Sequence, residues 1–202
     1  MPISLVGAVF SIWDPVERHP RGGGFGCWWV TIRRRWENGP MQTPPRRLLL
    51  VRHAHAEQWG RTDFERGLTD GGRAEASEAG RALARLGVVA DAALVSAATR
   101  AVETWQRLAS GAGWDVVPAL SRSLYGATAE ATAEEIRLAS ESTRTLVVVG
   151  HNPTTETLAH LVADDDIDAT FHPASFALYD VPCDWADLAW GTARLTDFRA
   201  PS

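Results

Sequence analysis

The stretch LLLVRHAHAE (residues 48–57) decides the fold that we expect for this chain. Its four consecutive apolar residues, 48–51, are typical of a strand buried on both faces, as in a parallel sheet covered by helices. The strand ends at Arg52 and His53. Because ligands of open α/β sheets bind beyond the carboxyl ends of the strands, these two side chains stand where a functional site is expected.

A second apolar strand, residues 146–149, ends in the same way. His151 and Asn152 follow it closely, and Pro153 opens a helix. If the two strands are neighbours, His53 and His151 converge on one pocket beside a helix N-terminus, which favours anions.

An arginine follows a third strand end. Arg100, in SAATRAVET (residues 96–104), lies in the first turn of the next helix, from which its guanidinium can reach the same edge of the sheet. Two arginines and two histidines around one crevice would repel one another unless an anion lay among them. The sequence therefore predicts a phosphate-like ligand.

The rest of the chain alternates short strands and helices, with a loop at residues 58–70. Further strands are expected at 92–95, 115–117, 175–181 and 188–195, and helices at 73–86, 99–109, 130–140 and 153–163. Strand–helix–strand order requires right-handed crossovers and a largely parallel sheet. The last two strands alternate enough to form a closing antiparallel pair at the sheet edge. The fold class is therefore α/β.

Composition excludes several functions. The chain is 45% hydrophobic and 22% charged, with a net charge of −5, and it contains no lysine, which excludes a lysine Schiff base and a P-loop lysine. An acidic protein is a poor nonspecific binder of nucleic acid. Since the chain has no apolar run of ~20 residues, no export signal and two widely separated cysteines, Cys27 and Cys183, we expect a cytoplasmic protein with no membrane partner.

Residues 1–40 differ in texture from the rest. They hold six of the 17 glycines and four of the nine tryptophans, without a sustained helical or strand period. We expect a disordered extension here, followed by one domain over residues 41–202. A tryptophan-bearing interaction arm is the alternative.

Five segments resemble the histidine phosphatase superfamily, and most closely its short SixA-type phosphohistidine phosphatase branch. They are, in order, LLLVRHAHAE, LTDGGRAEASEAG, LVSAATRAVETW, LYGATAEA and VVVGHNP. The resemblance covers residues 46 to about 182 and implies a phosphoglycerate mutase-like, three-layer α/β/α sandwich around a mostly parallel sheet. Ala54 replaces the glycine of the superfamily's RHG motif, as the SixA-type branch often does.

The same resemblance implies roles for the strand-end residues. His53 would be a nucleophile that forms a phosphohistidine intermediate. Arg52, Arg100 and His151 would bind the phosphoryl oxygens, and neither a metal nor another cofactor would be used. A largely neutral imidazole near pH 7 and two fixed guanidiniums suit phosphoryl transfer, which depends mainly on positioning and charge stabilisation.

The proton donor is not determined by the resemblance. Larger members carry a glutamate in the loop after the third strand, whereas Glu130 is the first acid here and already starts a helix. Glu57, Asp63 and Glu65, in the loop beyond the first strand, are the alternatives. Asn152 either caps its helix or binds the ligand.

A metal site is the less favoured interpretation. His53, His55 and Glu57 alternate like ligands on a strand, and His151 could complete the set. The metal site is less favoured because an arginine beside a ligand histidine would repel the cation. We expect His55, two residues past His53, to be an exposed loop residue rather than a catalytic one.

Three functions therefore remain open. The first is a metal-independent phosphatase for protein phosphohistidine, the second a phosphatase for small phosphomonoesters, and the third a noncatalytic phosphate-binding module. A mutase is less favoured, because the chain lacks insertions that would enclose a sugar or glycerate.

Overall fold

The structure is a computed structural model that describes residues 45–201. The extension expected over residues 1–40 lies outside the described residues. The strands are β1 (Arg46–Arg52), β2 (Ala92–Ser96), β3 (Ala119–Ser121), β4 (Thr145–Gly150), β5 (Phe176–Val181) and β6 (Arg194–Arg199). The helices are α1 (Asp70–Arg85), α2 (Thr99–Ala112), α3 (Ala129–Arg137) and α4 (Thr154–Val162), with a 3-10 turn at Trp185–Asp187.

The six strands form one mixed sheet in the order β3-β2-β4-β1-β5-β6. The first four strands of that order are parallel, and β5 and β6 are antiparallel additions at one edge. The expected α/β fold with a mostly parallel sheet and a closing antiparallel pair is therefore confirmed.

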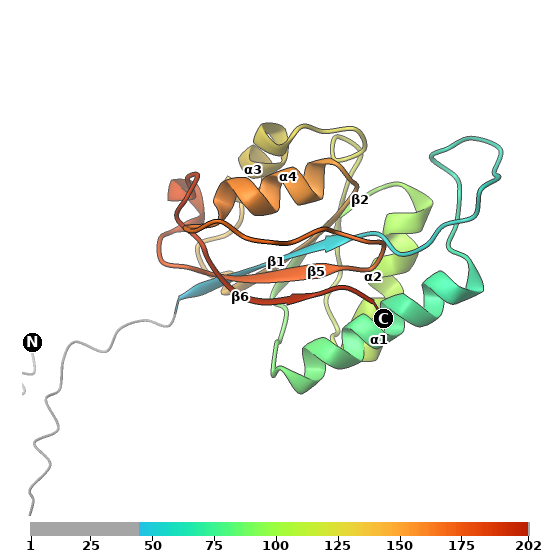
Figure 1. Cartoon of the computed structure of the whole chain (residues 1–202), viewed down its shortest axis with the longest axis horizontal. Coiled ribbons are helices and arrows are strands. Elements are labelled where there is room, and N and C mark those ends of the chain that lie inside the picture. Colours follow the sequence, from blue (N-terminus) through green and yellow to red (C-terminus); the bar gives the residue numbers. More distant parts are fainter. Residues whose placement is uncertain (1–44, 202) are drawn as a thin grey trace, which may run out of the picture. The chain divides into compact units, whose positions relative to one another are not determined.

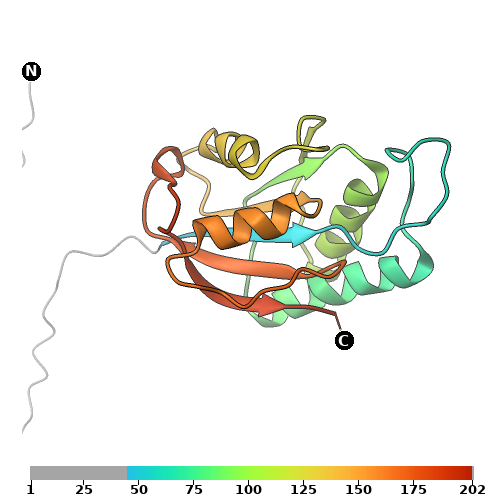
Figure 2. The same cartoon turned by 45° about the horizontal axis from the view of Figure 1, so that its top comes forward.

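Helices cover both faces of the sheet (Figures 1 and 2). Along β1, Leu48 and Leu50 face the layer that contains α3 and α4, whereas Leu49 and Val51 face α1 and α2. All four side chains are fully buried. The apolar run therefore gives β1 two buried faces and places it at the centre of a three-layer α/β/α sandwich.

The third and last strands were wrongly predicted. Residues 115–117 form no strand, and β3 lies at Ala119–Ser121, where it pairs with the last three residues of β2. Of residues 188–195 only the last two lie in a strand, because the left-handed backbone of Gly191, with φ of 70°, interrupts an extended path before β6 begins at Arg194. A local sequence pattern does not show which residues pair with a neighbouring strand, and it is this pairing that defines β3 and β6.

Threonine caps define where two of the helices begin. The Thr69 hydroxyl accepts a hydrogen bond from the Gly72 amide at 2.9 Å, so α1 begins at Asp70 rather than at residue 73. The Thr128 hydroxyl caps α3 in the same way, so α3 begins at Ala129 rather than at residue 130. The same helix ends at Arg137 rather than at residue 140. No helix within residues 45–201 is long and apolar enough to cross a membrane.

Candidate active site

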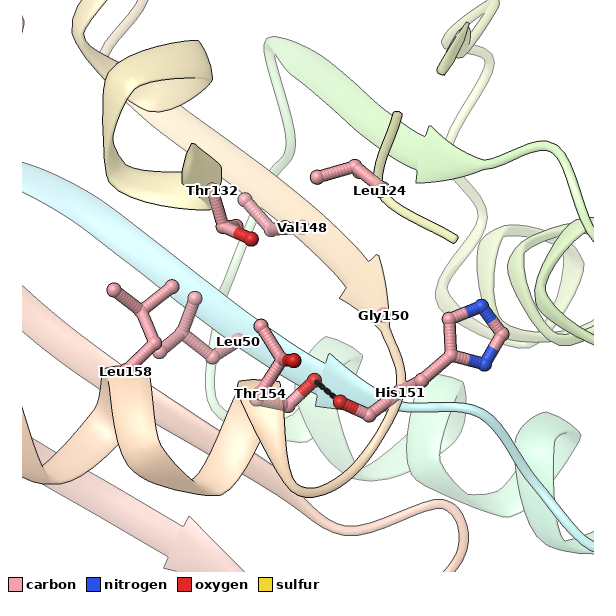
Figure 3. A pocket seen from close by; sticks show the side chains of 9 residues that line it. Leu50, Leu124, Thr132, Val148, Gly150, His151, Thr154 and Leu158 are labelled. Carbon is pink, nitrogen blue, oxygen red and sulfur yellow. Dashed lines mark hydrogen bonds between the residues drawn. The ribbon is translucent and has the colours of Figure 1, made fainter. Parts of the chain in front are cut away.

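The two strand-end histidines lie side by side at the carboxyl edge of the sheet. Strands β1 and β4 are parallel neighbours, and the His53 amide donates to the Gly150 carbonyl at 3.0 Å. The ring centroids of His53 and His151 are 5.1 Å apart. Figure 3 shows Gly150 at the tip of β4 and the His151 imidazole pointing away from Leu50 and Leu158, two of the apolar side chains that line a small pocket between β4 and α4.

Helix α2 brings Arg100 to the same place. Its Thr104, fully buried, accepts from the Ala54 amide at 3.0 Å and donates to the Arg100 carbonyl at 2.6 Å. This bond fixes the first turn of α2 against the residue that follows His53. Arg100 Nε then donates to His53 Nε2 at 3.3 Å.

The hydrogen bonds of His53 define its tautomer. Nδ1 lies 2.8 Å from the carbonyl oxygen of Ala54, which can only accept, so Nδ1 carries the proton. Nε2 is therefore the nitrogen with a free electron pair, and it receives the Arg100 donor. In this tautomer the lone pair of a neutral imidazole lies on Nε2, on the side of Arg100.

Burial keeps both histidines uncharged. Desolvation is the largest cause that lowers the pKa of His53 to about 4, and the charges of Arg100 and Arg52 add to it. Desolvation, followed by His53 and Arg100, lowers the pKa of His151 to about 3. Both rings are therefore neutral at pH 7.

Ser96, at the end of β2, orients His151. Its fully buried hydroxyl accepts weakly from the Ala98 amide at 3.4 Å, so its proton is available for His151 Nε2 at 2.8 Å. In that arrangement His151 Nδ1 carries the ring proton, and Nδ1 is a buried atom without a protein partner. It is thus a donor available to a ligand.

Arg52 and Asn152 lie against the same backbone carbonyl. Arg52 NH1 donates to Phe171 O at 2.5 Å, and Asn152 Nδ2 donates to that oxygen and to Glu156 Oε2, both at 3.1 Å. Arg52 Nε and Asn152 Oδ1 are buried without protein partners. No side chain caps α4, so the capping role considered for Asn152 is wrong.

The expected repulsion among the four basic side chains is relieved in another way. The histidines are neutral, and two carboxylates supply counter-charge, Asp63 at Arg100 and Glu156 near Arg52. These four basic side chains, which we call the cradle, therefore do not need an anion to be stable together. The unpartnered Arg52 and His151 nitrogens of the cradle still provide hydrogen-bond donors for one.

Two residues of the site were not identified from sequence. Ser96 ends a strand just as Arg52 does, so the strand-end rule applied to β2 would have found it. Tyr125 lies with its ring edge-on to His151 at 5.6 Å and donates its hydroxyl proton to Asp63 Oδ2 at 2.6 Å. It comes from an irregular segment between β3 and α3, where no periodic pattern indicates which side chains point inward.

The three acids considered as proton donors differ in their surroundings. The Asp63 carboxylate accepts from Tyr125, Arg66 and Arg100, and the first two bonds are the main causes that hold its pKa well below the usual range. Glu57 is exposed and lies beside the surface pocket that His55 also lines, and Glu65 is exposed and bonded to Thr62.

The alternative metal set is not assembled. His55 is exposed, as expected, and its Nδ1 is bonded to Glu75 at 2.7 Å, while His53 is bonded to Arg100. Within the described part of the chain no three His, Cys, Asp or Glu side chains are grouped as metal ligands.

Fold and site together define an α/β protein that brings two histidines and two arginines together at the carboxyl ends of parallel strands. Residues 48–143 match the family described as histidine phosphatase superfamily (branch 1). An uncharacterized protein of Mycobacterium tuberculosis is 35% identical over 161 residues, which cover 75% of this chain and 99% of the relative.

Solved structures give the same result. A candidate phosphohistidine phosphatase SixA from Nakamurella multipartitia superposes with a TM-score of 0.68 and 28% identity, covering 79% of this chain and 99% of the other. A corresponding candidate from Agrobacterium tumefaciens gives 0.64 and 29%, with 78% and 99% covered. The protein histidine phosphatase SixA complexed with tungstate, 18% identical with a TM-score of 0.66 over 75% of this chain and 95% of the other, shows the fold alone.

The chain belongs to the histidine phosphatase superfamily, in its SixA-type branch. It is a phosphatase, and the resemblance found in its sequence motifs is confirmed.

Proposed function

We propose that this phosphatase hydrolyses phosphohistidine on proteins, without a metal, through a phosphohistidine intermediate on His53. One observation carries the proposal: the unprotonated Nε2 of a neutral His53 accepts a hydrogen bond from Arg100 Nε at 3.3 Å. A nucleophile and a fixed positive charge thus meet at one point, which is what transfer of an anionic phosphoryl group requires.

The reaction has two steps. His53 Nε2 attacks phosphorus, the bond from phosphorus to the substrate nitrogen breaks, and the leaving imidazole takes a proton. A water molecule then attacks the phosphorus on His53, the bond from phosphorus to Nε2 breaks, and a proton of the water passes to solvent, which leaves inorganic phosphate and the neutral imidazole.

Three groups are placed to stabilise the phosphoryl oxygens during transfer. Arg100 Nε now points at Nε2 and would turn to an oxygen of the bound phosphoryl group. Arg52 Nε and His151 Nδ1, both buried without protein partners, would supply further donors. The Arg52 and His151 donors are preorganised, so they would stabilise the charge on the equatorial oxygens without Mg²⁺ because they are in place before the reaction begins.

The substrate class follows from the weak provision for proton donation. The lowered pKa of Asp63 keeps its side chain ionised, so it has no proton to donate, and Glu57 and Glu65 are exposed side chains. An alkoxide leaves poorly without an acid, which typically contributes ~10²–10⁴-fold. An imidazole has a pKa of about 6.5 and can accept its proton from solvent, so phosphohistidine loses little when the acid is absent.

A small phosphomonoester is the second candidate substrate. The exposed groove lined by Thr62, Phe64, Arg122 and Tyr125 is open to solvent and shares Tyr125 with the site, so a free ester could enter it as well as a peptide. A noncatalytic phosphate-binding module is the third candidate.

We place the protein in the cytoplasm, consistent with cysteines that have no CxxC spacing.

The test compares kcat/KM for a phosphohistidine peptide, p-nitrophenyl phosphate and an alkyl phosphate. We expect the values to fall in that order. Comparable efficiency on the alkyl phosphate would show that a competent acid is present and would favour a small-molecule phosphatase. Phosphate binding without turnover of any of the three would favour the noncatalytic module.

A further inference from the structure

Asp63 accepts more hydrogen bonds than any other acid near the site. Arg100, with only 7% of its side chain exposed, places both terminal nitrogens on this one residue: NH1 donates to the Asp63 carbonyl at 2.7 Å and NH2 to Oδ2 at 3.1 Å. The third guanidinium nitrogen, Nε, donates to His53 Nε2. Asp63 therefore determines which edge of the guanidinium faces the nucleophile.

The same carboxylate is bound from two other directions. Tyr125 donates to Oδ2 at 2.6 Å, and Arg66 donates to Oδ1 through Nε at 2.8 Å and NH2 at 2.5 Å. The Tyr125 ring in turn lies 5.6 Å from the Arg100 guanidinium carbon and edge-on to His151. Asp63 thus connects the α2 side of the cradle to the β4 side.

The loop that carries Asp63 is itself held in place. The Phe64 carbonyl accepts from the Thr99 amide at 3.1 Å, and the Phe64 ring packs edge-on against Tyr125 at 5.1 Å. Arg66 NH1 donates to the Glu57 carbonyl at 2.7 Å, which ties the two ends of the loop together. An acid that must approach a leaving group, deliver a proton and recover it would have to give up several of these contacts.

We propose that Asp63 is a positioning residue, which clamps Arg100 and Tyr125 so that Arg100 Nε faces the His53 imidazole, and that it does not donate a proton to the leaving group. The inference rests on the proposed phosphatase function. It excludes one of the three acids considered as donors and gives that acid a different role, exerted through Arg100.

The deciding experiment is Asp63→Asn, which keeps the size of the side chain but removes its charge and places an NH₂ group among donors. Replacing a residue that orients a metal ligand typically costs on the order of 10- to 100-fold in affinity or activity, and Asp63 orients Arg100 in a comparable way. We expect kcat/KM to fall by the same factor, in that range, for a phosphohistidine peptide, p-nitrophenyl phosphate and an alkyl phosphate. The inhibition constant of vanadate, a mimic of pentacoordinate phosphorus, should rise with it.

Asp180→Asn is the matched control. Asp180 pairs with Arg194 at 2.7 Å, at the opposite end of β5 from the site, so removing this Asp–Arg pair should leave all rates unchanged. Tyr125→Phe removes one contact of the clamp and should produce a smaller loss, again equal for all leaving groups. Combined with Asp63→Asn it should be less than additive, and it replaces Asp63→Asn if that variant does not fold.

Two results would overturn the inference. A loss of ~10²–10⁴-fold on the alkyl phosphate, with the aryl phosphate, the phosphohistidine peptide and vanadate affinity unchanged, would identify Asp63 as the general acid. No change in any measurement would show that the clamp has no role. If the wild type does not turn over any substrate, the proposed function fails, and the vanadate affinities of the wild type and Asp63→Asn, measured by calorimetry, still test the clamp.

Discussion

Titration of His53 should occur far below the usual range for histidine. The structure lowers its pKa from 6.5 to about 4, mainly through burial. At pH 5.5 a ring with this pKa is about 97% neutral, whereas a ring with a pKa of 6.5 is about 9% neutral. The nucleophile should therefore remain available well into the acid range.

Nitrogen-15 NMR of labelled histidine measures both the pKa and the tautomer of His53, without interference from the titration of a substrate. We expect a midpoint near 4 and a neutral form protonated on Nδ1, because Nδ1 donates to Ala54 O. The spectrum of His53→Asn identifies the resonances. A midpoint near 6.5, or a neutral form protonated on Nε2, would refute the reasoning about burial and tautomer.

The same shift has a consequence for stability. Between pH 6.5 and 4 the unfolded chain binds a proton on this histidine and the folded chain does not, so the free energy of unfolding falls as the pH falls. The lowering to about 4 corresponds to about 3 kcal/mol when complete. Chemical denaturation from pH 7 to pH 4.5 measures this effect. The free energy of unfolding should fall further in the wild type than in His53→Asn, and the difference between the two is the contribution of His53.

Three further outcomes are expected. Gly80→Ala should destabilise the fold by about 1–3 kcal/mol, because an added Cβ would lie 2.1 Å from the Leu108 carbonyl oxygen where α1 crosses α2. Gly71→Ala is the control and should have little effect, since the atom nearest to its added Cβ is 3.7 Å away. Equal melting temperatures for the two variants would contradict this. Vanadate should inhibit turnover and EDTA should not, and a loss with EDTA that a divalent ion restores would favour a metal site. A chain that begins at Met41 should fold and keep its activity, because every proposed site residue lies after it, and an insoluble or inactive product would contradict the interpretation of residues 1–40.

Much of this architecture could be predicted because its signals are local. The apolar runs at β1 and β4 identify strands buried on both faces, and such strands place Arg52, His53 and His151 at one edge of the sheet. The first residues of α1 and α3 could not be predicted from hydrophobic periodicity, because capping side chains such as Thr69 define where these helices begin. The error at β3 arose because three residues carry too little pattern to define a strand before its partner is known.

The charge balance of the site could not be predicted. Asp63 and Glu156 are distant in sequence from the arginines whose charge they offset, and only the folded chain brings them together. The neutrality of the two histidines likewise depends on burial, which a sequence pattern does not quantify. Tyr125 is supplied by a loop whose path is determined by its neighbours.

The central claim is that His53 carries the phosphoryl group during turnover. Brief incubation of the wild type with a ³²P-labelled phosphodonor, followed by quenching and peptide mapping, should find an acid-labile, base-stable label on His53. His53→Ala should bind no label and lose turnover by more than the ~10²–10⁴-fold typical of a general acid or base, because the covalent route itself is absent. Label on another residue, or no label while turnover is fast, would contradict the account.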